Sequence, residues 1–237
     1  MGQPLLLEIT VESFDSAAAA ERGGADRIEL CADLNHGGTT PPVTTMRKLH
    51  EELEIPVFAL IRPRSGNFVY SEAEFTAMKR EIDVARDLGM DGVVLGVLRS
   101  DNSVDLDRTT ELVQWARPLD VTFHRAFDSA PDLLIALEDV IAAGAARILT
   151  AGGAANAQTG ASVLKKLVEA AGERIVIMPG GSLDAANIAG ILAATRAGEF
   201  HSGLGSVLPY GSSNLVKFEG EIHAMRRQLN VGIARAD

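Results

Sequence analysis

Short runs rich in β-branched residues recur along this chain. Each run ends in charged or glycine-rich residues and is followed by a helical Ala/Leu pattern. The runs are Leu5–Val11, Arg27–Cys31, Val57–Arg62, Gly92–Gly96, Val121–His124, Ala146–Thr150, Arg174–Gly180 and Glu199–His201. About eight strand–helix units is the count of a TIM-type (β/α)8 barrel. An open doubly wound sheet is the rival α/β architecture, but no glycine fingerprint for a dinucleotide supports it.

Length and charge narrow the class further. The chain has 237 residues, and one barrel typically takes about 250, so we expect a single domain over residues 1–237. A net charge of −10 disfavours nucleic acid and anionic membranes as partners. No apolar run approaches the length of a transmembrane helix. A single cysteine, Cys31, excludes an internal disulfide and fits a reducing cytoplasm.

Strand alternation predicts which side chains point into the barrel. Residues i and i+2 share a face, so Ile28, Leu30, Val121 and Phe123 should face the helices. The inward charged set is then Glu8, Glu29, His124 and His201, with Arg62 as a nearby cation. Barrel interiors are usually apolar, and buried charges must pair or meet a ligand. They could form a structural plug, such as a Glu29–Arg62 ion pair, or a ligand pocket, which we favour.

Several of these residue types suit acid–base chemistry. We assign catalytic roles to Glu8, Glu29, Arg62 and His124, because carboxylates and imidazole transfer protons near neutral pH. Substrate contacts are expected from Arg64, Arg125, Asp128 and His201. Arg125 and Asp128 could instead form a salt bridge that closes their loop.

Glycine-rich segments follow the last strands. Gly180, Gly181 and Gly203 lie where barrels often bind phosphate through backbone N–H groups, and Thr150 begins a similar segment. We expect these positions to bind a small anionic or phosphorylated ligand.

A metal site has little support from spacing alone. Cys31 and His36 bracket one loop, but the chain has no CxxC, no HxH and no Met-rich run. Copper(I) and zinc prefer two or more soft or imidazole ligands. Cys31 is thus either a lone metal ligand or a small buried apolar residue.

These segments together resemble the CutC family, whose members are described as copper homeostasis proteins. The matching residues are Ile28–Cys31, Gly37–Pro41, Ile61–Arg64, Phe68–Ser71, Asp91–Leu98, Val121–Asp128, Arg147–Thr150 and Glu199–His201. The resemblance implies a TIM-type barrel, a cytoplasmic location, a homodimer or higher homo-oligomer, and copper binding. The cysteine of the family at this loop corresponds to Cys31. Other members carry further cysteines that this chain lacks.

Two functional hypotheses follow. The first is a role in copper homeostasis with weak copper binding at Cys31. The alternative is a metal-independent barrel enzyme, of isomerase or lyase type, that acts on a small anionic or phosphorylated substrate.

Overall fold

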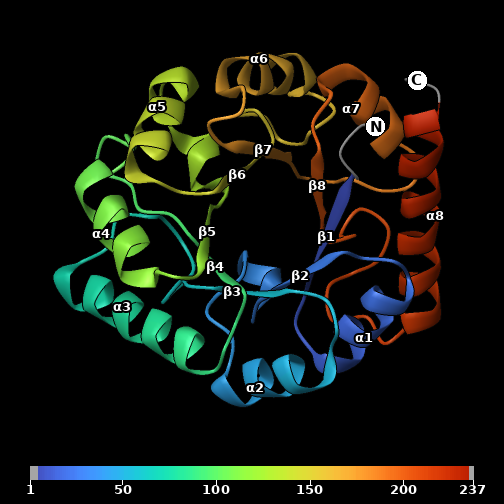
Figure 1. The fold of residues 1–237 in the computed structure, drawn as a ribbon, viewed down its shortest axis with the longest axis horizontal. Helices are drawn as coiled ribbons and strands as arrows, with labels where there is room; N and C mark the ends of the chain where they lie inside the picture. Colours follow the sequence, from blue (N-terminus) through green and yellow to red (C-terminus); the bar gives the residue numbers. More distant parts are fainter. Residues whose placement is uncertain (1–4, 235–237) are drawn as a thin grey trace.

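Eight parallel strands form one sheet in the order β7-β6-β5-β4-β3-β2-β1-β8 in the computed structural model, which describes residues 5–234. β7 and β8 lie next to each other and bring the sheet round into a barrel (Figure 1). The strands are β1 Leu6–Val11, β2 Arg27–Leu30, β3 Val57–Leu60, β4 Gly92–Leu95, β5 Asp120–Phe123, β6 Arg147–Thr150, β7 Val176–Pro179 and β8 Glu199–Ser202. The predicted TIM-type (β/α)8 fold is confirmed.

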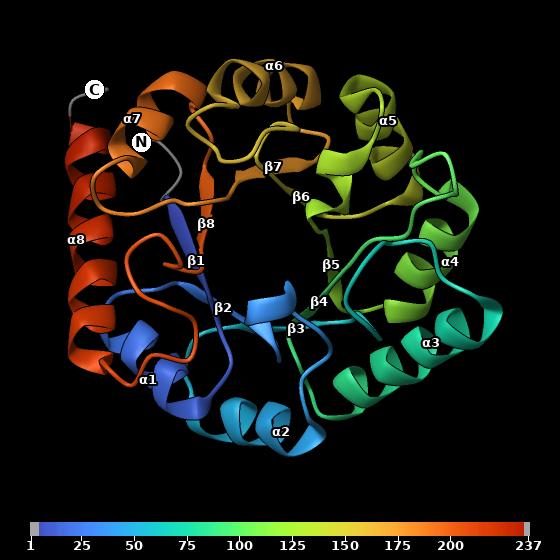
Figure 2. The same ribbon diagram turned by 180° about the vertical axis from the view of Figure 1, so that it is seen from behind.

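A ring of helices surrounds the strands in both views (Figures 1 and 2). The helices are α1 Phe14–Arg22, α2 Val43–Glu52, α3 Glu72–Asp87, α4 Leu106–Ala116, α5 Leu133–Ala143, α6 Ala161–Ala171, α7 Ile188–Thr195 and α8 Leu215–Ala234. Two 3-10 helices, η1 Leu34–His36 and η2 Arg125–Ser129, follow β2 and β5. The last helix, α8, packs on α1 and α7, which closes the ring.

Local sequence signals mark several boundaries. The predicted capping box begins α3, where the Ser71 side chain accepts from the Glu74 amide and Glu74 accepts from the Ser71 amide. Five expected strands, β2, β3, β4, β5 and β7, end one or two residues earlier than predicted, and this places two of the predicted catalytic residues outside their strands. β3 ends at Leu60 and β5 at Phe123, so Arg62 and His124 lie in the loops that follow. His124 becomes the N-cap of η2 because its ring accepts the Ala126 N–H.

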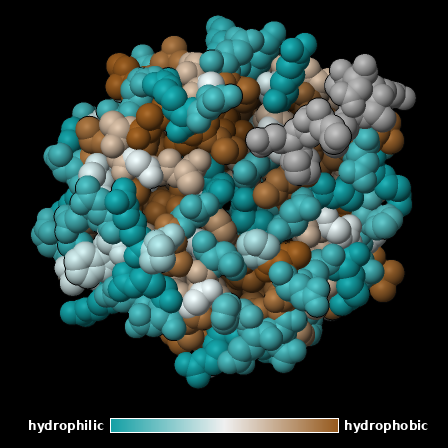
Figure 3. All heavy atoms as spheres, viewed as in Figure 1, coloured by the Kyte–Doolittle hydropathy of each residue, from teal (hydrophilic) through white to brown (hydrophobic). Residues whose placement is uncertain are grey.

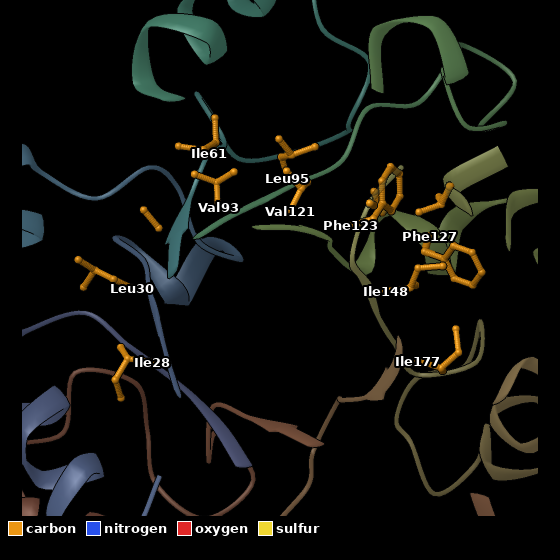
Figure 4. Close-up of a cluster of buried hydrophobic side chains, with 14 of the residues drawn as sticks. Ile28, Leu30, Ile61, Val93, Leu95, Val121, Phe123, Phe127, Ile148 and Ile177 are labelled. Carbon is orange, nitrogen blue, oxygen red and sulfur yellow. The ribbon is translucent and has the colours of Figure 1, made fainter. Parts of the chain in front are cut away.

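The apolar core lies between the strands and the helices. Ile28, Leu30, Val121 and Phe123 are buried in it as predicted, and Figure 4 shows these and neighbouring side chains extending from their strands. A smaller apolar cluster of Cys31, Phe58, Leu60 and Val94 is separate from this core. It comes from the inward positions of β2, β3 and β4.

An ion-pair network fills the amino-terminal half of the barrel interior. Arg27 pairs with Glu8, and its second nitrogen lies 2.7 Å from Glu199. Arg147 approaches the same Glu199 carboxylate at 3.3 Å. Both guanidinium groups lie 5.0 Å from the centroid of the Phe58 ring. A polar plug therefore exists, but Glu8, Arg27, Arg147 and Glu199 form it, rather than the Glu29–Arg62 pair that was the alternative to a ligand pocket.

Hydrophilic residues cover much of the helix ring on the face seen in Figure 1, and apolar residues form smaller groups between them (Figure 3). Within residues 5–234, no helix combines the length and the apolar character that crossing a bilayer requires.

Candidate functional site

A cavity of about 220 Å³ opens where the strands end. Its walls come from the ends of β2, β3, β5, β6 and β8 and from the loops that follow. The lining residues are Glu29, Cys31, Gly37, Leu60, Arg62, Phe68, His124, Arg125, Leu149, Gly181, His201 and Tyr210. The cavity thus gathers cations, a carboxylate, two imidazoles and a thiol in one small volume.

Arg62 brings a buried positive charge to this cavity without a carboxylate partner in the part of the chain that the structure describes. Its Nη1 donates to the carbonyls of Gly37 and Gly38, and its Nη2 donates to that of Gly66. The guanidinium lies 4.9 Å from the Phe68 ring centroid. The side chain is 5% exposed, and its Nε has no acceptor among the described residues. Three loop carbonyls and one aromatic ring therefore hold the guanidinium in place.

His124 lies in the same wall as a neutral ring. Its Nδ1 accepts the backbone N–H of Ala126 at 3.2 Å, which assigns the ring proton to Nε2. Burial, together with the positive charge of Arg62, lowers the pKa of His124 to about 3. The Nε2 atom is buried and has no partner within the described residues.

Glu8, His201 and Glu29 form a chain that leads from the plug to the cavity. His201 Nδ1 lies 2.7 Å from Glu8 Oε1, and its Nε2 lies 3.7 Å from Glu29 Oε2. Burial alone would raise the pKa of Glu8, but Arg27 and His201 lower it to about 2. Burial also opposes charge on His201, yet its hydrogen bond to Glu8 and the charge of Glu29 raise its pKa.

Glu29 differs from Glu8 although both carboxylates are buried. Burial raises the pKa of Glu29, and the attraction of His201 offsets this only in part. Glu8 is therefore a fixed anion inside the plug. Glu29 lines the cavity and is the carboxyl group suited to exchange a proton with a ligand.

Cys31 lines the cavity with a buried, protonated thiol. Its Sγ lies 3.2 Å from Thr10 Oγ1. Burial and the negative charge of Glu29 raise the pKa of the thiol well above its usual range. Within residues 5–234, no group of three His, Cys, Asp or Glu side chains is arranged to hold a metal ion.

Arg125 and Asp128 form the salt bridge that was the alternative to a substrate role, at 2.7 Å. Asp128 also accepts from Thr150 Oγ1 at 2.5 Å and from the amides of Ala151 and Gly153. The Asp128 carboxylate thus accepts the backbone N–H groups that were expected to bind a ligand anion. Thr150 accordingly lies outside the cavity wall, whereas Arg125 remains part of it.

The other residues predicted to bind substrate lie at different places around the cavity opening. Arg64 pairs with Glu74 at 2.5 Å and does not belong to the cavity wall. Gly181 does belong to it, and Gly180 packs against Leu149 and His201. Gly203 lines a second cavity of about 230 Å³, which shares Tyr210 with the first.

Sequence patterns did not identify three residues that line the cavity or fill the barrel interior. Phe68 and Tyr210 come from the loops after β3 and β8, where no periodic pattern indicates orientation. Arg147 could have been found, because it shares the inward face of β6 with Leu149 by alternation.

His124 depends on a glycine in the neighbouring strand end. A Cβ built on Gly96 would lie 2.6 Å from His124 Cε1 and Nδ1. We expect Gly96→Ala to displace the imidazole and to lower the free energy of unfolding by about 1–3 kcal/mol. Gly190→Ala is the matched control, because no atom lies within 4 Å of a Cβ there. Urea unfolding measures both, and a neutral Gly96→Ala would contradict the close packing.

Comparison with known proteins identifies the family. The model of the CutC family matches residues 5–206. The chain belongs to the CutC family. A family member from Chromobacterium violaceum is 50% identical over 83% of this chain and 80% of its own length. The human relative, named copper homeostasis protein cutC homolog, is 43% identical over 95% of this chain and 81% of its own length.

A solved structure agrees with this assignment. The crystal structure of a CutC protein from Streptococcus agalactiae superposes with a TM-score of 0.80 and 33% identity, covering 84% of this chain and 98% of that one. The resemblance noted in the sequence is confirmed, and a crystal structure of this family has the same fold.

Proposed function

We propose that this chain is a metal-independent barrel enzyme, of isomerase or lyase type, that moves a proton on a small anionic substrate. The observation that carries the proposal is Arg62, a buried cation that faces the cavity without a carboxylate partner among the described residues. Such a charge is costly unless a ligand compensates it. The cavity of about 220 Å³ has room for a small metabolite, since a water takes about 30 Å³.

The proposed roles follow from the contacts. Arg62 binds the anionic end of the substrate, and Arg125 with Gly181 extends the anion site at the mouth. Glu29 exchanges the proton, because its raised pKa brings it closer to the working range of a general acid or base. His201 holds Glu29 on one side and Glu8 on the other.

Ligand-induced stabilisation tests the anion site. We expect at least one of oxalate, pyruvate, inorganic phosphate and small sugar phosphates to raise the Tm of the wild type. Arg62→Met should abolish this increase without lowering the Tm of the unliganded protein, because a buried charge is removed. Glu29→Gln, the matched control, should keep most of the binding. If no anion raises the Tm, the proposal is wrong.

Copper homeostasis is the second candidate. It is favoured by the name of the human relative, copper homeostasis protein cutC homolog, and by the position of Cys31 in the cavity wall. Because Cys31 is the single cysteine of the chain, no second thiolate can join it within one subunit, so we expect weak copper(I) binding, which an intersubunit site could strengthen. Competition against a copper(I) chelator measures it, with Cys31→Ser as the control and the oligomeric state recorded. Tight binding at one copper per chain that Cys31→Ser abolishes would favour this candidate over the enzyme.

We also propose a cytoplasmic location and a homodimer or higher homo-oligomer. The buried free thiol of Cys31 is compatible with a reducing compartment. Exposed apolar side chains at Leu134 and Ile135 of α5 offer surface for subunit contact. Light scattering of the purified protein gives the subunit number directly.

A further inference from the structure

Two cavities lie next to each other at the carboxyl ends of the strands, and one residue belongs to both. The inner cavity, of about 220 Å³, is the candidate site described above. The outer cavity, of about 230 Å³, lies between the start of α1 and the loop that joins β8 to α8. Tyr210 of that loop is the single residue, among those described, that lines both cavities. Its side chain therefore forms part of the wall between them.

Two glycines give the Tyr210 ring its position. A Cβ on Gly203 would lie 3.1 Å from Tyr210 Cε1 and Oη, and a Cβ on Gly205 would lie 2.8 Å from its Cζ and Oη. The ring thus packs directly on glycine backbone, which allows the close approach. Thr10 continues the wall, because its Cγ2 would lie 2.9 Å from the same Gly203 Cβ and its Oγ1 lies 3.2 Å from Cys31 Sγ in the inner cavity. Tyr210 itself is 37% exposed, so its truncation leaves the packed core intact.

The two cavities differ in charge. Arg62 and Arg125 bring positive charge to the inner cavity. In the described wall of the outer cavity, Glu12 is the one charged side chain, and its Oε1 accepts the Leu34 N–H at 2.8 Å. Hydroxyl and apolar side chains make up most of that wall, among them Ser13, Ser16, Ser212, Leu208, Leu215 and Phe218. The anionic end of a ligand is therefore favoured in the inner cavity, and the outer cavity suits an uncharged chain.

We propose that Tyr210 is a specificity-determining residue that limits the length of the substrate. This inference rests on the proposed function and narrows the substrate to compact acids whose uncharged end stops at the Tyr210 ring. The inner cavity of about 220 Å³ holds about seven groups of the size of a water, at about 30 Å³ each. That space is enough for pyruvate but not for a long alkyl chain. Without the ring, the outer cavity continues the site and accepts such a chain.

A series of monocarboxylates tests the limit, with pyruvate as the reference and acetate, butyrate, hexanoate and octanoate as probes of increasing length. In calorimetry, the wild type should bind pyruvate and the short acids more tightly than octanoate. Tyr210→Ala should bind octanoate at least about tenfold more tightly than the wild type does, because each methylene that enters the outer cavity strengthens binding. Tyr210→Val should gain less, and Tyr210→Phe, which keeps the ring, should retain the wild-type order. All variants should keep the pyruvate affinity.

A second substitution separates a joined cavity from a loosened loop. Ser212 lines the outer cavity, so Tyr210→Ala/Ser212→Phe puts bulk into the space that the first substitution opens. We expect the double variant to lose the gain for octanoate and to keep its pyruvate affinity. A gain that survives in the double variant would show that octanoate does not use the outer cavity, which contradicts the proposal.

The outcomes distinguish this inference from the proposed function. If pyruvate binds in an Arg62-dependent way but octanoate binds equally to the wild type and Tyr210→Ala, the role of Tyr210 is wrong and the anion-binding enzyme remains. The same holds if inorganic phosphate raises the Tm and none of the carboxylates binds. If no anion of any kind binds to either protein, both proposals fail.

Discussion

Replacing Glu8 by Gln should lower the free energy of unfolding by about 3–5 kcal/mol, the range for removing one partner of a buried ion pair. Glu8 is fully buried and accepts from both Arg27 and His201. The neutral amide would leave two buried cations without their shared anion. Urea unfolding at neutral pH measures this loss.

The same substitution at Glu29 provides the control. Glu29 is also buried, but its raised pKa means that the fold does not favour its ionised form. Glu29→Gln should therefore change the free energy of unfolding by about 1 kcal/mol or less, and an increase would agree with a functional site. The double variant Glu8→Gln/Arg27→Met should recover part of the loss. Equal losses for Glu8→Gln and Glu29→Gln would contradict the division into plug and pocket.

Acidification should destabilise the fold through His124. Its pKa in the folded chain is about 3, below its usual 6.5, so its neutral form contributes stability that is present above pH 6.5. That contribution is lost as the pH falls towards 3 and amounts to about 5 kcal/mol, at about 1.4 kcal/mol per pH unit. We expect His124→Gln to flatten the pH dependence of stability.

Other groups titrate in different ranges or with the opposite sign. The pKa of Glu8 is lowered from 4.5 to about 2, so its contribution disappears only below pH 4.5. The raised pKa of His201 gives stability that is lost as the pH rises above 6.5. Between pH 6.5 and 4.5, the difference between wild type and His124→Gln therefore reports on His124. Identical slopes for the two proteins in this range would show that the imidazole is not held neutral.

The sequence predicts which side chains point into the barrel better than it predicts which charged groups form pairs there. Alternation along β1, β2 and β8 correctly turns Glu8, Glu29 and His201 inward, because one face of each strand is continuously apolar. Which charges meet depends on how neighbouring strands are offset. Glu8 is in register with both Arg27 and His201, an offset that no local pattern encodes.

Loops account for most of the remaining differences. Arg62 lies beyond β3, and loop carbonyls rather than Glu29 hold its guanidinium. Asp128 accepts hydrogen bonds from two backbone amides of a glycine-rich segment. The composition of that segment had indicated a ligand site. Side chains such as Tyr210 enter the cavity wall from irregular loops. Residue alternation cannot predict the direction of a side chain in such a loop.

The central claim is that the strand ends form an enzyme pocket in which Glu29 exchanges a proton with a small anion. The most direct measurement incubates each anion that raises the Tm with the protein in D2O, in the presence of a copper(I) chelator, and follows deuterium incorporation or product by NMR. We expect the wild type to exchange or convert at least one of them, and Glu29→Gln to be slower by about 10²–10⁴-fold. An activity that is equal in Glu29→Gln, or that appears only with copper and Cys31, would contradict the claim.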